Sequence, residues 1–499
     1  MKCDYDSMRC SIVALLVLSL CACQKHPQAA PTHASAPPPA QRAHAAPAAT
    51  QVPPPPPGGP GGMPPMPSIA QTKYQAAVYI DNGRYLAAKS TPAAVQSGQV
   101  TDTGGSGLRI RHDGNDFNGV LVLGSKSDVT LQDASIDLKG DGSNDILGIG
   151  AGVMVAGDST LVLRHVDVTT TGVVASAAFA GGHGTLKAYD STFRSNGGTL
   201  PPGYVPKIGP GMKTPPWPLG ITGTARATLT TGDSRSYYYH STIITKGWGA
   251  LSTDACRDAY LEADDSTVQV LDSGYGAYAD NGCTVVIDRS KIDSATYDGI
   301  IAGTGKMTFA DDHAIAGKNA VMIHNVMGLG TEVAHLTIDK GEFSSGAATV
   351  LVKSANADIE IEDARLTSKD GILLKAIVNS DPNATKVKKG QHVPGIHVSI
   401  EDSSLKGDLV DQDPKHALSI TLQGSTLTGT ITDATLSLDA GSQWHATGDS
   451  SVTLVMAADI ARIDAPADVT ITAKAAPGAH FPQVRYPLHG GGVLIVAEP

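Results

Sequence analysis

The stretches "YLEADDSTVQVLDSGYG", residues 260–276, and "VVIDRSKIDSATYDG", residues 285–299, decide the fold of this protein. In each, apolar and polar residues alternate, a polar pair follows, and a further apolar position precedes a glycine. Alternation with a period of two predicts β-strands, and the Asp, Ser and Gly positions predict the turns between them. Both stretches therefore describe the same unit, a set of short strands joined by tight turns.

The unit recurs along most of the chain. Related units start at residues 129, 161, 186, 237, 307, 336, 359 and 397, and most neighbouring starts lie about 22 to 29 residues apart. A repeat of this length without helical periodicity predicts a solenoid, in which each coil buries its apolar side chains against the next coil. Successive strands would pair in parallel about 4.8 Å apart. An array of β-sandwiches is the alternative all-β architecture.

This pattern resembles the right-handed parallel β-helix repeat proteins of the pectin-lyase-like superfamily. The resemblance covers most of residues 100–460. It implies an all-β, single-stranded solenoid, which we place at residues 71–475, with a C-terminal tail or cap at 476–499. The resemblance is specific for the fold and says little about function, because function depends on the site and not on the scaffold.

A polar residue recurs at the turn of each unit. Stacked polar residues at such turns usually hydrogen bond to backbone groups of the neighbouring coil, and we interpret this column as structural and not catalytic. Its expected members are Asp133, His165, Asp190, His240, Asp265, Arg289, Asp312, Lys340, Asp363 and Asp402.

The N-terminal region predicts export and lipid attachment. The apolar run "SIVALLVLSL", residues 11–20, is about half the ~20 residues that span a bilayer and suits a secretory signal, with translation starting at Met1 or Met8. The sequence Leu-Cys-Ala-Cys at 20–23 resembles the bacterial lipobox, which implies a signal peptide at 1–22 and a lipid on Cys23. Gln24 favours the outer membrane, so we expect a lipid-anchored protein on its periplasmic or cell-surface face.

A proline-rich segment follows the anchor. Residues 27–67 hold 15 of the 31 prolines, which favours an extended or disordered linker over residues 23–70. After lipidation of Cys23 the mature chain keeps one further pair, Cys256 and Cys283. Their separation of about one coil predicts a disulfide in an oxidising compartment.

Charge and motifs exclude several classes of partner. A formal net charge of −11 argues against nucleic acid, and we find neither a phosphate-binding glycine loop nor a zinc cysteine pattern. The loop "DLKGDGSND" offers Asp137, Asp141 and Asp145 as oxygen ligands, so calcium is the possible cofactor, with an ordinary Asp/Gly turn as the alternative.

A catalytic assignment finds little support in the sequence. "GGHG", residues 181–184, resembles the Gly-His-Gly of polygalacturonases, which would make His183 catalytic. That family also needs an Asn-Thr-Asp and an Asp-Asp pair before the histidine, whereas the Asp-Asp pairs here, 264–265 and 311–312, follow it. The sequence therefore leaves enzymatic activity open, and a non-catalytic role is the leading interpretation.

Two loops interrupt the repeat and are candidates for binding, because rigid scaffolds usually present function on loops. Residues 200–220 contain seven prolines and Trp217, and form either a sugar-binding wall or a lid over an apolar flank. Residues 379–394 place three lysines in an acidic protein, and form either a solvated loop or a docking site for an acidic glycan.

Alignment of successive coils predicts a recognition face. Aromatic residues recur before a shared Gly or Ala, and polar residues follow the same strand, so that ligand-binding residues would be Trp217, Trp248, Asp254, Tyr275, Asp280 and His324. Aromatic and polar rows side by side suit a long glycan, although an aromatic row can also be packing between coils. The leading hypothesis is a non-catalytic surface protein that binds glycan or another polymer; a polysaccharide lyase or glycoside hydrolase with a divergent site is the alternative.

Overall fold

The computed structural model describes residues 68–209, 211–325, 328–382 and 384–497. The expected signal peptide, Cys23 and nearly all of the expected linker lie outside the described residues. The described chain is built of β-strands with six short 3₁₀ helices: η1 Ile69–Gln71, η2 Ala87–Lys89, η3 Pro92–Ala94, η4 Asp145–Leu147, η5 Trp217–Leu219 and η6 Ala457–Arg462. Among these residues no helix is long and apolar enough to cross a bilayer.

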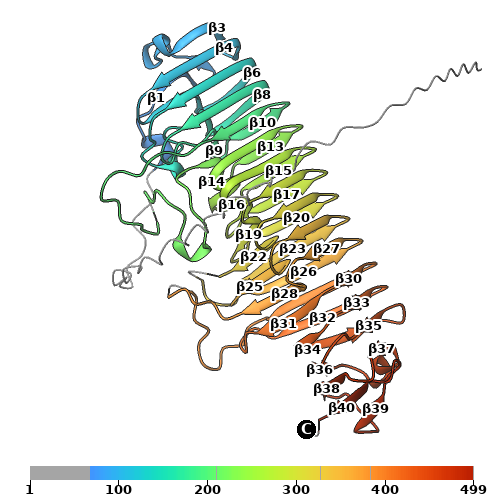
Figure 1. The fold of residues 1–499 in the computed structure, drawn as a ribbon. Coiled ribbons are helices and arrows are strands. Elements are labelled where there is room, and N and C mark those ends of the chain that lie inside the picture. The colour runs from blue at the N-terminus through green and yellow to red at the C-terminus, as the bar shows by residue number, and fades with distance from the viewer. Residues whose placement is uncertain (1–67, 210, 326–327, 383, 498–499) are drawn as a thin grey trace, which may run out of the picture. The chain divides into compact units, whose positions relative to one another are not determined.

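The strands stack coil upon coil in chain order, which confirms the parallel β-helix (Figure 1). Each coil contributes strands to three parallel ladders. We call the first ladder the covered sheet. It contains β1 Gln75–Asp81, β5 Phe117–Leu123, β7 Val153–Ala156, β9 Ala178–Gly181, β12 Arg226–Gly232, the later parts of β14 Thr242–Cys256 and β16 Thr267–Ala279, β19 Tyr297–Ala302, β22 Val321–His324, β25 Val350–Lys353, β28 Ile372–Ile377 and β31 Asp408–Gln412.

The second ladder, the alternating sheet, shows the half-buried pattern that period-two alternation predicts. It contains the first parts of β4 Gly104–Asp113, β6 Ser125–Lys139 and β8 Asp158–Thr171, then β10 Thr185–Tyr189, β13 Arg235–Tyr239, β15 Tyr260–Asp264, β17 Thr284–Asp288, β20 Lys306–Ala310, β23 Val333–Asp339, β26 Asn356–Glu362, β29 Ile396–Glu401, β32 Leu418–Gln423, β34 Ile431–Leu438, β36 Ser450–Leu454, β38 Thr470–Ala475 and β40 Val493–Val496.

The third ladder closes each coil. It contains the last parts of β4, β6 and β8, the first parts of β14 and β16, and the short strands β11 Thr192–Ser195, β18 Lys291–Ser294, β21 His313–Ala316, β24 Glu342–Ser345, β27 Arg365–Ser368, β30 Ser404–Lys406, β33 Thr426–Thr428, β35 Gln443–His445 and β37 Ile463–Asp464.

Both ends of the stack are closed by antiparallel strands. At the N-terminal end β2 Arg84–Tyr85 pairs with β1, and β3 Val95–Thr101 pairs with β4. At the C-terminal end β39 Arg485–Pro487 pairs with β40, which itself continues the parallel stack on β38. The segment expected as a tail, 476–499, thus includes a further strand of the solenoid. Closed ends deny the edge pairing that makes an exposed strand aggregate.

The polar turn column is a row of left-handed residues. Nine of its ten expected members have φ between 44° and 54°. In the remaining coil Asp311 (φ 55°) takes this position and not Asp312, which corrects that assignment by one residue. Left-handed backbone is uncommon outside glycine and is tolerated best by short polar side chains, which is why Asp dominates the column.

Directly after this corner, several coils place a buried serine whose hydroxyl joins neighbouring coils. The amide of Ser191 donates to the Ser241 hydroxyl (3.2 Å), and the amides of Ser241 and Ser266 donate to Ser266 and Ser290 (both 3.0 Å). We call this row the serine ladder. It satisfies backbone groups that turn away from the sheets and would otherwise be buried without partners.

Candidate functional site

The covered sheet differs from the other ladders because the outer face of its strands up to β22 is shielded from water, whereas β25, β28 and β31 again include partly exposed positions. Strands such as β5, β7 and β12 are buried at nearly every position, whereas the alternating sheet is buried at every second one. Strands buried on both faces read as continuous apolar runs. Segments 68–74, 141–152 and 196–225 lie against this outer face, and we call the last of them the cover segment.

At the strand ends of this sheet, the register brings the expected polar residues into one row. Ser252 pairs with Tyr278, which places Asp254 beside Asp280. Ala279 pairs with Ile301, which places Ala302 beside Asp280, and Ala302 pairs with His324 of the following coil. His324 in turn pairs with Lys353. We call this row the strand-end edge.

Arg226, which begins β12, is the centre of a buried charge cluster behind this edge. Its side chain is 3 % exposed, and Nη2 donates to Asp254 Oδ2 at 2.7 Å. Nε lies 3.6 Å from the carboxylate of Asp145, which is 2 % exposed, and the guanidinium stacks 4.6 Å from the Trp248 ring. The Arg226 cluster thus joins the 141–152 segment to β14. Sequence analysis did not identify Arg226, although a lone arginine opening the uncharged segment "RATLTT", 226–231, was a signal.

Asp254 and Asp280 occupy different environments despite being neighbours. Asp254 accepts hydrogen bonds from Arg226 and from the Ala255 amide (both 2.7 Å). Burial raises the pKa of Asp280 to about 7, and repulsion from Asp254 adds to this effect. A carboxyl that keeps its proton near neutral pH can act as a general acid beside a second carboxyl.

A groove of about 1100 Å³ follows the strand ends of the preceding coils and reaches Ala255, the chain neighbour of Asp254, although neither carboxyl lines it. Thr231, Ala255 and Arg257 line one end of it, and Tyr74, Tyr79, Lys73 and Lys89 line the other. Its floor is a column of stacked glycines with φ of 66° to 85°, at which a side chain would meet the backbone of the previous coil at most positions: Gly124, Gly157, Gly182 and Gly232. A smooth backbone floor between polar walls suits an extended ligand.

The aromatic half of the expected recognition face is buried. Trp248 and Tyr275 are each 1 % exposed, because Leu219 and Ile221 of the cover segment pack against them. Neither ring can stack on a ligand in this arrangement. The cover segment therefore forms a lid over an apolar flank, and Trp248 and Tyr275 could bind a ligand only if this segment moved away. Trp217 lies in that segment and is 39 % exposed.

Lysines beyond the edge fasten the cover segment. Lys353 Nζ donates to Pro218 O at 3.2 Å, and Lys318 Nζ donates to Gly220 O at 3.5 Å. His324 is 3 % exposed beneath this region, and burial, with a contribution from Lys353, lowers its pKa to about 4. His324 is therefore neutral at neutral pH, and its Nε2 has no hydrogen-bond partner among the described residues.

The three aspartates considered for calcium have separate partners. Asp137 lies 3.1 Å from Arg111, Asp141 accepts the Val173 amide at 2.8 Å, and Asp145 faces Arg226. Since their carboxylates point to different groups, they do not form a shared ligand set. Within the described ranges no three His, Cys, Asp or Glu side chains are grouped as metal ligands.

The other sequence candidates resolve as follows. Cys256 and Cys283 form the expected disulfide, with Cα atoms 5.6 Å apart. His183 is exposed and lies 3.6 Å from Asp233. The lysine-bearing loop 379–394 is tied to residues 328–332, for example through the Gly328 amide and the Thr385 hydroxyl (2.8 Å), and its lysines remain exposed.

A row of partly exposed tyrosines on the alternating sheet was missed. Tyr189 and Tyr239 stack with ring centroids 5.2 Å apart, and Arg164 lies 4.5 Å from the Tyr189 ring. The alternation in "YYYH", 237–240, was the signal, because it directs Tyr238 inward and its neighbours outward. The rings stack on each other along the coils, so they reinforce the solenoid and present their edges to solvent.

No protein-family model matches this sequence, and no curated protein matches it either.

Proposed function

We propose that this protein is a lipid-anchored β-helix that binds an extended polysaccharide in the groove beside the Asp254–Asp280 edge. The single observation that supports this most is the groove itself, which follows successive strand ends of one rigid sheet. A glycan chain is long and rich in hydroxyls, and it needs many weak polar contacts arranged along a line.

The groove provides such contacts. Lys89 lies 4.9 Å from the Tyr79 ring and 3.8 Å from Asp81, so charged, polar and aromatic groups meet at one point of the wall. Arg257 at the other end is 70 % exposed while its guanidinium is held by Asp233 at 2.7 Å. Side chains that are already ordered lose less conformational entropy when a ligand arrives.

The membrane location is part of the proposal and is supported by sequence. The lipobox-like 20–23 and the proline-rich segment behind it would hold the β-helix away from an outer membrane. An acidic net charge of −11 fits a partner other than nucleic acid.

Glycoside hydrolysis is a second candidate, favoured by the Asp254–Asp280 pair. A general acid must hold its proton near neutral pH, and the pKa of Asp280 is raised to about 7 by burial and by Asp254. Asp254, which accepts a hydrogen bond from Arg226, would be the partner carboxyl.

One experiment separates the two candidates. The protein is incubated with a panel of neutral and acidic polysaccharides, and both retention on the polymer and new reducing ends are measured, together with ultraviolet absorbance from unsaturated lyase products. Retention without products, unchanged in Asp280→Asn, supports binding alone. Products that disappear in Asp280→Asn support hydrolysis, and neither retention nor products with any polymer would contradict both candidates.

A further inference from the structure

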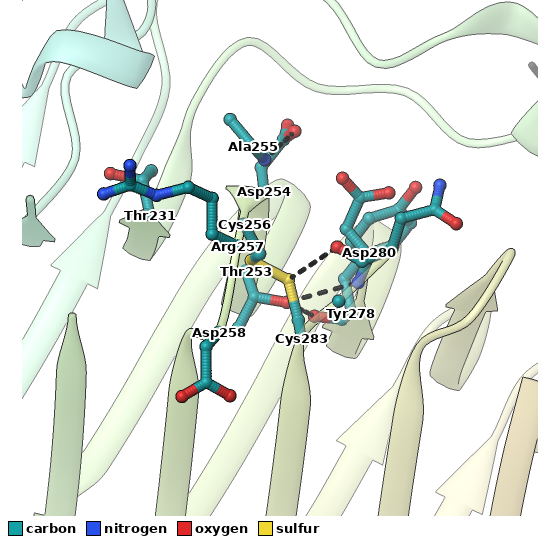
Figure 2. The surroundings of a disulfide bond; sticks show 12 residues. Thr231, Thr253, Asp254, Ala255, Cys256, Arg257, Asp258, Tyr278, Asp280 and Cys283 are labelled. Atoms are coloured by element: carbon teal, nitrogen blue, oxygen red, sulfur yellow. Dashed lines mark hydrogen bonds between the residues drawn. A yellow bond between two sulfur atoms is a disulfide. The ribbon is translucent and has the colours of Figure 1, made fainter. Parts of the chain in front are cut away.

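The disulfide joins the two turns that directly follow Asp254 and Asp280. Cys256 is two residues after Asp254, and Cys283 is three residues after Asp280 (Figure 2). The preceding coils have Gly124, Gly157 and Gly182 at the strand end, so their stacking needs no covalent link there.

Backbone pairing between β14 and β16 stops just before the two carboxyls, although Asp254 still pairs with Thr231 of β12 on its other side. The ladder between β14 and β16 ends at Ser252 and Tyr278, and the ladder from β16 to β19 ends at Ala279 and Ile301. Asp280 therefore projects beyond the last paired residue on both sides. In the β12–β14 ladder the register shifts between Thr231 and Gly232, which marks a bulge where Ala255 has a left-handed φ of 51°.

Beyond the ladder, Thr253 and the disulfide connect the two coils. The Thr253 hydroxyl donates to Tyr278 O at 2.7 Å and accepts from the Asp280 amide at 3.3 Å (Figure 2). The disulfide is the covalent link, with Cα atoms 5.6 Å apart. The Cys283 amide also donates to Asp280 O at 3.0 Å, which closes the turn that begins with the acid.

Two carboxylates at facing positions of neighbouring strands repel each other, so this arrangement tends to open. Arg226, which contacts Asp254, and links outside the ladder oppose that tendency. We propose that the Cys256–Cys283 disulfide is the positioning element that holds the Asp254 and Asp280 carboxyls side by side at the end of the groove. The positioning of the two carboxyls does not depend on the proposed function; only their contact with a bound glycan does.

Titration of Asp280 tests this without any ligand. In protein labelled with ¹³C at aspartate carboxyls, the Asp280 signal is assigned by its loss in Asp280→Asn, and we expect a midpoint of about 7. In Cys256→Ser/Cys283→Ser the two turns can separate, which lessens repulsion and admits water. The midpoint should then fall by about one pH unit or more.

Ser266→Ala is the matched control, because it removes a buried hydroxyl of the serine ladder and lowers the melting temperature while leaving the disulfide intact. Its Asp280 midpoint should equal that of the parent protein. If the double cysteine variant melts at a lower temperature yet keeps the parent midpoint, the disulfide is a stabilising cross-link only and the proposal is overturned.

If the double cysteine variant does not fold, chemical reduction of the disulfide in the folded parent protein provides the same test. The folded parent protein is treated with a phosphine reductant, which can approach the half-buried Cys256, and the same carboxyl signal is followed. A lowered midpoint supports the proposal, and an unchanged midpoint after complete reduction refutes it. Because no polysaccharide is present, failure of glycan binding leaves this result unaffected.

Discussion

In one coil Asp312 occupies the position that a serine takes elsewhere in the serine ladder, and this aspartate makes the stability of the solenoid depend on pH. Its carboxyl is 2 % exposed and accepts the amides of Ser290 (2.7 Å) and Ala310 (3.1 Å). Burial raises the pKa of Asp312 to about 8, with the charges of Asp288 and Asp311 contributing. The folded protein therefore keeps a proton on Asp312 at neutral pH, whereas the unfolded chain releases it near the ordinary value of about 4.

The sign and size of the effect follow from this difference. A raised pKa in the folded state means that the stability is fully present below about pH 4 and is lost as the pH rises toward 8. The loss is about 1.4 kcal/mol per pH unit over that range, or about 4 kcal/mol by pH 7. Asp312→Ser removes the charge and supplies a hydroxyl that can accept the Ser290 amide. The free energy of unfolding of this variant, relative to the parent, should therefore increase as the pH rises.

Urea denaturation followed by circular dichroism at about pH 4, 6 and 8 measures this difference. Hydrogen exchange of the Ser290 amide reports on the same coil locally, which matters because a long solenoid can unfold in parts. The control is Asp402→Asn at the exposed corner of a distant coil, whose free energy of unfolding relative to the parent should change little with pH. If Asp312→Ser differs from the parent by the same amount at all three pH values, the buried-proton reasoning is refuted.

Three further predictions address other parts of the structure. Arg226→Leu leaves Asp145 and Asp254 without their counter-charge and should lower the free energy of unfolding by about 3–5 kcal/mol in urea titrations, whereas an unchanged value would show that the cluster contributes nothing. Ser266→Ala should cost about 1–3 kcal/mol, measured the same way, because the Ser241 amide loses its buried acceptor; a neutral result would argue against the ladder. Cys23→Ala should move the protein from the membrane to the soluble fraction with loss of palmitate label, and persistence in the membrane would contradict lipidation.

The sequence was sufficient for the coil because each signal there is local. Alternation sets which residues of a strand face inward, and the left-handed corner favours Asp over several coils. At "ADDHA", 310–314, two adjacent aspartates fit the corner equally well, and only the strand register places Asp311 there and Asp312 inside. The disulfide was also predictable, because the coil period itself brings the two cysteines together.

The site was less predictable because its parts come from distant segments. Asp254 and Asp280 follow from the repeat, but their contacts depend on Arg226, and Asp145 reaches that arginine from a loop some 80 residues earlier. Trp248 has a left-handed φ of 77°, a rare conformation for a bulky residue, and its amide donates to Thr222 O of the cover segment at 2.8 Å. No pattern local to "GWGA" shows that a segment 30 residues before it closes over the ring.

The most direct test of the proposed function is the affinity of groove variants for the polysaccharide that the panel identifies. Lys73→Ala/Lys89→Ala removes two lysines from the groove wall, and Lys291→Ala/Lys306→Ala removes two exposed lysines from the third and alternating sheets with the same change in charge. We predict that the first variant binds the polymer at least about tenfold more weakly, a loss of about 1.4 kcal/mol, while the second binds like the parent. Equal affinities for both variants and the parent, with unchanged melting temperatures, would contradict the assignment of the groove as the binding site.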